Sequence, residues 1–296
     1  MLSFYKNELK EIDKNILSTS VDDIPRLFNK IPLGLFGSIC CLDMGRDRYP
    51  NLDKYLPTMA SDDVQMSWTG SCGEVLLQQS VDFAKSVVHF FENIRGGGMK
   101  FCIKDANILD FGCGWGRLSR LFLKYTSENQ MYAVDPWDES LRHCAEHKVR
   151  ARFGQTEYIC RSLPFEDVKF DLVYAYSVFT HLSYKACRTA LSTIHSRMKN
   201  DSVLAITVWD KDCWDIIGQM RENVPVKKLQ NEHDKKGFAF IPHENLEPIE
   251  GEITYGETSV SLEYIEKEWH DWEIIGTDVS LWAPTQKIVF LSPIKK

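Results

Sequence analysis

A short apolar segment leads directly into a turn with three glycines, Gly112, Gly114 and Gly116, in the stretch ILDFGCGWGRL. Glycine loses more conformational freedom on folding than any other residue, so a cluster of glycines needs a physical reason. One reason is a ligand pressed against the backbone. The alternative is a tight turn from a strand to a helix with nothing bound. Asp110 stands two positions before the first glycine, so any ligand of the turn must tolerate a carboxylate.

Strand-like and helix-like segments alternate on both sides of this turn. Apolar segments typical of strands lie at 107–111, 130–135, 156–160, 170–177 and 203–209. Helical faces lie between them, within 118–125, 139–148 and 187–198. This alternation predicts βαβ units and a parallel, doubly wound sheet. Because 272–293 is typical of two strands joined by a Pro-containing turn, we expect a Rossmann-like α/β fold. Its sheet should be mostly parallel and seven-stranded, with an antiparallel C-terminal hairpin.

The flanks of this core have a weaker pattern. The first 60 residues predict short helices and loops, and a clear helix follows, with an apolar face formed by Leu77, Val81, Ala84, Val88 and Phe91. The RGGG segment at 95–98 is expected to end that helix, because glycine accepts a left-handed cap. We therefore expect an N-terminal helical extension or lid, 1–98, and a catalytic domain, 99–296. In the latter, 211–224 predicts a helix and 228–260 a polar region rich in turns.

Composition and charge limit the class of protein. The chain has 296 residues, of which 44% are hydrophobic and 26% charged, as in ordinary soluble globular proteins. A net charge of −7 disfavours a nucleic-acid partner, since phosphate binding normally leaves a basic footprint. The N-terminus is charged, and no apolar run is long enough for a membrane span, so we expect a cytoplasmic protein. The nine cysteines are scattered without a zinc-site spacing, so reduced thiols and no metal are expected.

The residues around the glycine turn favour one kind of ligand. The helix after the turn offers unpaired N–H groups and a partial positive charge to a carboxylate or phosphate. Compared with the dinucleotide fingerprint G-x-G-x-x-G, the third glycine comes one position early, and Asp110 precedes the turn. An ionised Asp110 repels a pyrophosphate and favours a cationic group. Asp135, at the end of the next strand, suits the two ribose hydroxyls. A ribonucleoside with a cationic, amino-acid-like tail is therefore expected, and S-adenosylmethionine fits this description better than NAD.

Three motifs, LDFGCGWGRL, YAVDPW and FDLVYAYSVFTHLS, resemble those of class I S-adenosylmethionine-dependent methyltransferases. The resemblance covers roughly residues 105–210. The flanking segments LPTMASDDVQMSWTGSCGEVLL and YGETSVSLEYI resemble a bacterial-type subgroup of that family associated with glycan or sugar modification. The motifs of the core are the more specific of the two sets.

The resemblance implies a set of residues that bind the cofactor. The methionine moiety would be lined by Asp110, Gly112, Cys113 and Gly114, with Gly116 making the turn. Asp135 would hold the ribose, and the adenine would lie against Pro136, Trp137 and the backbone of Leu163. Ser177 would face the methyl group, and Thr69 and Gly70 would form a lid. Ile159 stands where many members carry an acid, which weakens the assignment of the adenine contacts.

Each of these assignments has a simpler alternative. Asp135 can cap the helix that follows it. Trp137 can be a packed aromatic residue, and Thr69 and Gly70 can simply start the helix that begins near residue 73. Cys113 is more consistent with a small residue tolerated in the turn than with a nucleophile.

His181 is the candidate catalytic residue, because it follows the strand at 170–177 on the expected cofactor side of the sheet. Methyl transfer to a hydroxyl requires in-line attack on the sulfonium methyl group, and a nearby imidazole is suited to remove the proton. The alternative is a histidine that only packs at the start of a helix. The region after residue 208 should cover the acceptor, with Asp210, His243 and Tyr255 as candidate contacts. Trp209, Trp214 and Tyr255 are candidates for an aromatic platform under a sugar ring or for core positions.

The sequence thus predicts methyl transfer from S-adenosylmethionine to a small-molecule or glycan acceptor, most consistently at oxygen. The first alternative is a protein that binds the cofactor without catalysis, as a sensor or as the partner of an active enzyme. An NAD-dependent oxidoreductase is disfavoured by Asp110 and by the glycine spacing. A nitrogen acceptor or a nucleic-acid base remains open, and the acidic balance and the absence of an N/D-P-P-Y/F-type motif disfavour the latter. Nothing in the sequence indicates the oligomeric state.

Overall fold

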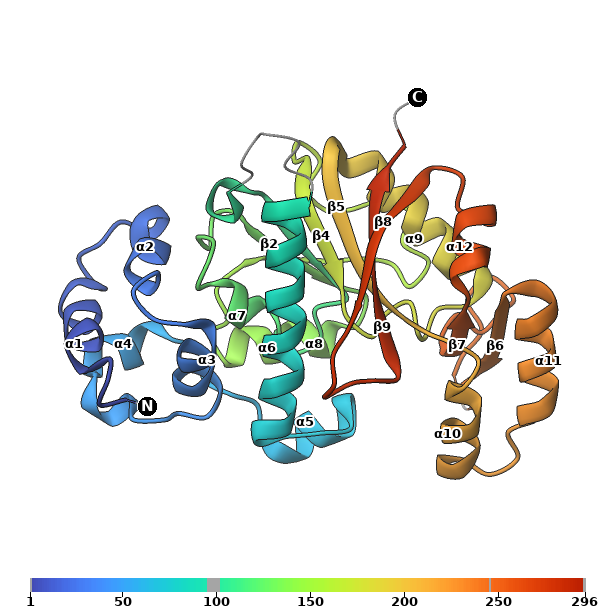
Figure 1. Ribbon diagram of the computed structural model, residues 1–296, viewed down its shortest axis with the longest axis horizontal. Helices are drawn as coiled ribbons and strands as arrows, with labels where there is room; N and C mark the ends of the chain where they lie inside the picture. The colour runs from blue at the N-terminus through green and yellow to red at the C-terminus, as the bar shows by residue number, and fades with distance from the viewer. Residues whose placement is uncertain (1, 95–101, 245, 295–296) are drawn as a thin grey trace. The chain divides into compact units, whose positions relative to one another are not determined.

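The computed structural model describes residues 2–94, 102–244 and 246–294, and the chain forms two compact units, Met1–Gln155 and Thr156–Lys296 (Figure 1). The expected boundary between residues 98 and 99, and the RGGG segment beside it, lie outside the described residues. The division into 1–98 and 99–296 therefore stays a prediction.

The first unit begins with short helices, as the sequence predicts. They are α1 (Lys6–Asn15), α2 (Ile24–Phe28), α3 (Leu33–Cys41), α4 (Pro50–Tyr55) and α5 (Asp62–Thr69), with single 3₁₀ turns at Val21–Asp23 and Arg46–Arg48. Their apolar side chains form a core that includes Leu9, Phe28 and Phe36. The Arg46 side chain is buried, and its guanidinium donates to Asp53 at 2.7 Å and to the carbonyl of Pro57 at 3.0 Å. These hydrogen bonds hold the loop between α3 and α5 in place.

Helix α6 (Gly73–His89) continues into a wider π-helical turn, Phe90–Ile94. Of the expected apolar face, Leu77, Val81, Ala84 and Phe91 are buried and Val88 is half-buried. Apolar residues that recur every three to four positions lie on one side of a helix, and that side is the buried one here. The prediction of this amphipathic helix is therefore confirmed.

Three parallel strands form the sheet of the first unit, in the order β3-β2-β1. They are β1 (Ile108–Phe111), β2 (Met131–Asp135) and β3 (Arg152–Gln155), and the connecting helices are α7 (Ser119–Phe122) and α8 (Asp138–Glu146). Every residue of β1 and β2 is buried, as expected for strands covered on both faces. A one-turn 3₁₀ helix, Ile103–Asp105, precedes β1.

The prediction of a strand at 156–160 is wrong, because the third strand is β3, which ends directly before that segment. β3 has the polar sequence RFGQ and pairs only with β2, so its outer edge needs no apolar run. Ile159 and Cys160 are buried without forming a strand, which explains why an apolar segment there is misleading.

In the second unit the strand order is β4-β5-β9-β8. β4 (Phe170–Ala175) and β5 (Met198–Trp209) are parallel, whereas β5, β9 (Gln286–Pro293) and β8 (Trp272–Val279) are antiparallel neighbours. The predicted C-terminal hairpin is thus confirmed. The helices are α9 (Tyr184–Arg197), α10 (Cys213–Met220), α11 (Val226–Lys236) and α12 (Leu262–Glu268). Met198, expected on the face of the helix α9, is instead the first residue of β5.

A small second sheet replaces much of the turn-rich region expected at 228–260. It consists of β6 (Phe238–Pro242) and β7 (Gly256–Val260), antiparallel, with α11 beside it (Figure 1). β7 is fully buried although its sequence, GETSV, is mostly polar. Its polar side chains are buried because each has a partner: Thr258 donates to the carbonyl of Leu182 at 2.7 Å, and Ser259 accepts from the Trp214 indole at 2.9 Å. A polarity pattern alone does not reveal such a strand.

The fold class is therefore the expected Rossmann-like α/β fold, with an N-terminal helical region and antiparallel C-terminal strands. Across the described residues, none of the helices combines the length and the apolar character needed to cross a membrane.

A pair of glycine substitutions separates backbone strain from crowding. Gly116 (φ +78°) and Gly70 (φ +71°) both adopt left-handed angles, so alanine costs about 1–2 kcal/mol of backbone strain at either site. At Gly116 a new Cβ would also lie 3.0 Å from the Val149 methyl carbons and 3.2 Å from the Cys144 sulfur, whereas at Gly70 nothing lies within 4 Å. We expect Gly116→Ala to lower the free energy of unfolding by about 1–3 kcal/mol more than Gly70→Ala in urea denaturation. Equal losses would contradict the close packing at Gly116.

Candidate functional site

The glycine turn has a backbone that side chains disfavour. Gly112, Gly114 and Gly116 have φ angles of +76°, +53° and +78°, all in the left-handed region. The N–H groups of Gly112 and Cys113 both donate to the carbonyl of Val134, at 2.9 and 3.0 Å. The turn that follows β1 is therefore fastened to the end of β2, and the need for glycine is conformational whether or not a ligand is bound.

Asp110 is a buried acid in β1, 2% exposed. The hydroxyl of Ser119, the first residue of α7, donates to its Oδ2 at 2.6 Å. The structure thus places a carboxylate between the strand and the helix that the glycine turn connects.

Asp135, the last residue of β2, links two backbone segments. Its Oδ2 accepts from the N–H of Gly114 at 2.9 Å, and its Oδ1 accepts from the N–H of Trp137 at 3.0 Å. Burial raises the pKa of Asp135 above its usual range, although both hydrogen bonds act in the opposite direction. The carboxylate therefore orients the glycine turn as well as the start of the next helix, which is more than the capping role considered as its alternative.

Trp68 is a residue of this region that the sequence analysis missed. Its ring stacks on that of Trp137, with centroids 4.6 Å apart and planes at 27°. It also lies beside Gly114, because a Cβ built on that glycine would be 4.0 Å from a Trp68 ring atom. The signal was the aromatic residue directly before Thr69 and Gly70 in SWTG.

Thr69 and Gly70 end one helix and do not start the next. Gly70 is the left-handed C-cap of α5, and the Thr69 hydroxyl donates to the carbonyl of Gln65 at 2.7 Å. The N-cap of α6 is Cys72. The structural alternative considered for this pair, the start of the following helix, is therefore wrong.

In the second unit, Ser177 follows β4 with an unusual backbone. Its φ is +59°, which is uncommon for a residue with a side chain and is frequent at functional sites. Its N–H donates to the Thr207 hydroxyl at 2.7 Å, and its own hydroxyl accepts from the Gln286 amide at 3.2 Å. Leu163, the candidate for a backbone contact to adenine, is buried.

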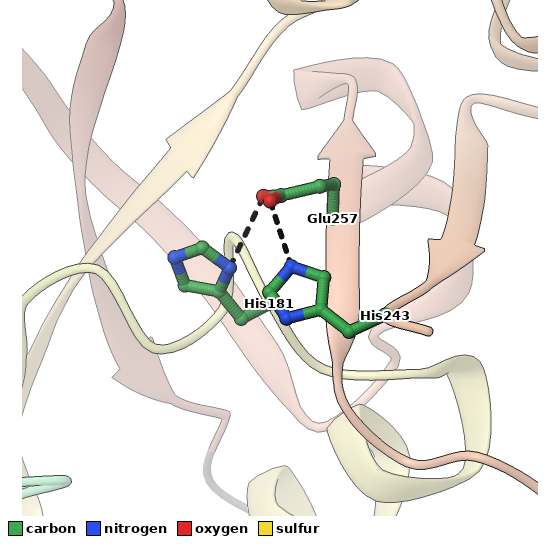
Figure 2. A group of neighbouring side chains, drawn as sticks. All are labelled: His181, His243 and Glu257. Carbon is green, nitrogen blue, oxygen red and sulfur yellow. Dashed lines mark hydrogen bonds and ion pairs between the residues drawn. The ribbon is translucent and has the colours of Figure 1, made fainter. Parts of the chain in front are cut away.

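His181 lies in a cluster with His243 and Glu257 (Figure 2). Its Nδ1 is 2.8 Å from the carbonyl oxygen of Gly256 and 3.2 Å from Glu257 Oε2. His243 Nε2 is 2.8 Å from Glu257 Oε1. The Tyr255 ring is stacked on the His181 ring, with centroids 5.1 Å apart and planes at 19°. Three sequence candidates thus come together, whereas Glu257 was missed because it lies in the polar segment that proved to be β7.

Asp210 and Trp214 have other surroundings. Asp210 is 3.3 Å from His233 Nε2 and more than half-exposed, and no interaction with His181 is found for it within the described residues. Trp214 is fully buried and donates to Ser259, so it belongs to the core and not to a platform under a ligand. Trp209 packs edge-on against His181, with ring centroids 5.3 Å apart.

Comparison with known proteins identifies part of the chain. Residues 108–201 match the family model described as a methyltransferase domain. The chain is 33% identical over 93 residues to an uncharacterized methyltransferase of Schizosaccharomyces pombe, covering 28% of this chain and 34% of that protein. It therefore spans about a third of the length of this curated relative.

Solved structures with a similar chain path include an S-adenosylmethionine-dependent methyltransferase from Clostridium acetobutylicum, which is 14% identical with a TM-score of 0.42. That match covers 64% of this chain and 84% of the other. The PH0226 protein from Pyrococcus horikoshii is 16% identical with a TM-score of 0.49, over 71% of this chain and 91% of its own.

The segment that matches the methyltransferase-domain model, 108–201, contains β1, the glycine turn, β2 and β4. The comparisons do not extend to the acceptor or to the glycan-modifying subgroup.

The Glu257 cluster makes stability depend on pH in the acid range. Burial alone raises the pKa of Glu257, but hydrogen bonds from His181 and His243 and their charges outweigh it and lower the pKa to about 2. Its contribution to stability is thus fully present above about pH 4.5, the pKa of a free glutamate side chain, and is lost as pH falls through 2. The stability advantage of the wild type over Glu257→Gln should shrink by roughly 3 kcal/mol across that window. Urea denaturation at several pH values measures it, with Glu266→Gln, exposed on α12, as the charge control; parallel curves for wild type and Glu257→Gln would contradict the prediction.

Proposed function

We propose that this protein transfers the methyl group of S-adenosylmethionine to a small-molecule or glycan acceptor, at oxygen. The observation that carries the proposal is the left-handed glycine turn held by Asp135 and preceded by the buried Asp110, inside the segment that matches a methyltransferase domain. That combination favours a cofactor with a ribose and a cationic tail over a dinucleotide.

In this proposal the cofactor contacts are those implied by the family resemblance. The methionine moiety lies against the backbone of the turn, near Asp110, and the ribose hydroxyls are accepted by Asp135. The remaining assignments are Gly112, Cys113, Gly114 and Gly116 in the turn, Pro136, Trp137 and Leu163 at the adenine, Ser177 near the methyl group, and Thr69 and Gly70 at the lid. The Cys113 thiol takes no chemical part, because its hydrogen bond with Cys144 and its burial raise its pKa well above the usual range.

Trp68 extends this map. It lies beside Gly114 and stacks on Trp137, so its ring borders both the position proposed for the methionine moiety and that proposed for the adenine. An aromatic ring at this place contributes a large apolar surface to a bound nucleoside. We assign it, together with Thr69 and Gly70, to the proposed lid.

His181 is the proposed base. The acceptor oxygen attacks the sulfonium methyl group in line, and an imidazole nitrogen takes the hydroxyl proton as the new bond forms. Nδ1 of His181 faces a backbone carbonyl at 2.8 Å, which can only accept a hydrogen bond. Nδ1 therefore carries the proton of the neutral ring, and Nε2 is the nitrogen that can receive one.

Calorimetric titration tests cofactor binding. We expect micromolar binding of S-adenosylmethionine and S-adenosylhomocysteine and no binding of NAD. Asp135→Asn should weaken S-adenosylmethionine at least tenfold, about 1.4 kcal/mol, because the ribose loses a charged acceptor and the glycine turn loses its anchor. Asp138→Ala, which removes an exposed acid three positions later, is the matched control. Undiminished affinity in Asp135→Asn would remove this residue from the cofactor site.

The catalytic proposal is tested by turnover. Release of S-adenosylhomocysteine is measured over a panel of hydroxyl-bearing acceptors, starting with sugars. His181→Gln should lower the rate about 10²–10⁴-fold without changing cofactor affinity, which is the range for loss of a general base. His270→Gln, an exposed histidine of the same unit, is the control. Cofactor binding without turnover on any acceptor would instead favour a non-catalytic sensor or partner subunit.

A further inference from the structure

Glu257 is a carboxylate surrounded by donors. It is 9% exposed, on the buried strand β7, and its two oxygens face His181 and His243 (Figure 2). The Arg221 guanidinium is 3.5 Å from the same oxygen that accepts from His243. Three basic groups thus share one acid, and nothing in the cofactor assignments uses it.

We propose that Glu257 is a positioning residue for His181: it holds the ring with its proton on Nδ1 and stabilises the imidazolium that forms when the acceptor loses its proton. The inference rests on the proposed function for the role of His181 as base. The arrangement of the two side chains is independent of that role.

The tautomer of His181 follows from its neighbours. The carbonyl oxygen of Gly256, 2.8 Å from Nδ1, has no proton to give, and the ionised carboxylate of Glu257, 3.2 Å away, has none either. Both neighbours accept, so the proton lies on Nδ1. Figure 2 shows the second ring nitrogen, Nε2, on the side of the ring that points away from Glu257.

The backbone fixes the ring in this orientation. Gly256 pairs with His181 in both directions, because its N–H donates to the His181 carbonyl at 2.8 Å while its own carbonyl accepts from the ring. A Cβ on Gly256 would lie 2.1 Å from the carbonyl oxygen of Ile241, so only glycine permits this approach of the strands. Tyr255 stacks on one face of the ring and Trp209 contacts it edge-on, which restricts rotation of the side chain.

The charge balance of methyl transfer explains why an acid belongs there. The acceptor O–H bond breaks and its proton goes to Nε2; the O–CH₃ bond forms as the S–CH₃ bond breaks, and the sulfonium becomes a neutral thioether. The positive charge of the cofactor therefore ends on His181. A carboxylate 3.2 Å from Nδ1 stabilises this charge, as in other acid–histidine pairs.

A divalent metal ion is the competing occupant of the cluster. The candidate ligand atoms of His181, His243 and Glu257 all lie within 4.8 Å of one another. A metal needs the unprotonated lone pair of a ring nitrogen, however. Nδ1 of His181 is protonated instead, because it donates a hydrogen bond to the carbonyl oxygen of Gly256. The Arg221 guanidinium also occupies a place beside the carboxylate where it would repel a cation. Cys213, whose pKa burial and Glu257 both raise, remains a neutral thiol here.

Nitrogen-15 NMR of the histidine rings tests the arrangement without reference to activity. In the wild-type protein, at a pH where the His181 ring is uncharged, we expect the ring to carry its proton on Nδ1, with Nε2 unprotonated. A proton on Nε2 would overturn the proposal. So would micromolar binding of Zn²⁺ or Mn²⁺ that shifts the ring signals of both His181 and His243.

Kinetics of Glu257→Gln test the consequence for catalysis. Glutamine keeps the size of the side chain and an accepting oxygen but removes the charge. We expect kcat to fall about 10–100-fold, with KM for the acceptor and the affinity for S-adenosylmethionine changed less than twofold. Glu250→Gln, whose carboxylate pairs with Arg161 and Lys185 on the surface, is the control and should leave all three values unchanged.

The two measurements distinguish the failure of this inference from that of the proposed function. An Nδ1 proton on His181 with full activity in His181→Gln would refute the base and leave the arrangement of the pair intact. A large loss in His181→Gln with none in Glu257→Gln would refute the role of Glu257 alone. If Glu257→Gln does not fold, the wild-type tautomer decides the first half of the proposal.

Discussion

The hydrogen bonds of one carboxylate, Asp135, connect the two turns that follow β1 and β2. Asp135 accepts from the N–H groups of Gly114 and Trp137, so the turn after β1 and the turn after β2 are fixed to the same atom group. Parallel strands put their carboxyl ends at one edge, and loops there are free to diverge unless something joins them. In this chain the join is an acid that is buried at considerable cost in solvation, which is tolerated because backbone donors surround it. The same turn is also held by the N–H groups of Gly112 and Cys113, which donate to the carbonyl of Val134, and Trp137 beside it stacks on Trp68.

Much of the fold was predictable because its signals are local. Strands β1, β2, β4 and β5 are apolar runs buried on both faces, and the C-terminal hairpin has its own turn residues. Predictions failed for strands that are polar in sequence, whether at an edge of the sheet or buried. The edge strand β3 has only one neighbour and no apolar run, while β7 is buried and polar because every polar side chain in it has a partner. No periodicity distinguishes such a strand from a loop, since the partners come from distant segments.

The same division applies to the candidate site. Glycines and acids next to strand ends were found from spacing, because the functional residues of a βα turn lie close together in the sequence. Trp68 and Glu257 were not found, because each is linked to the site only through contact with a residue distant in sequence. Trp68 stacks on Trp137, and Glu257 lies beside His181. His181 itself was found from its place after β4, but its orientation depends on Tyr255 and Gly256, which no spacing rule connects to it.

Gly256 offers a way to sort related chains. The glycine turn is shared by methyltransferase domains with many acceptors, so its presence says little about what is methylated. A glycine that must touch the carbonyl of Ile241, followed at once by a glutamate, is a different kind of marker, because any side chain there would separate β6 from β7 and move the carbonyl that holds His181. Chains with a Gly-Glu pair at the start of the corresponding strand, and a histidine after the strand that corresponds to β4, form a group in which a common acceptor chemistry can be sought. Chains that have only the glycine turn fall outside it.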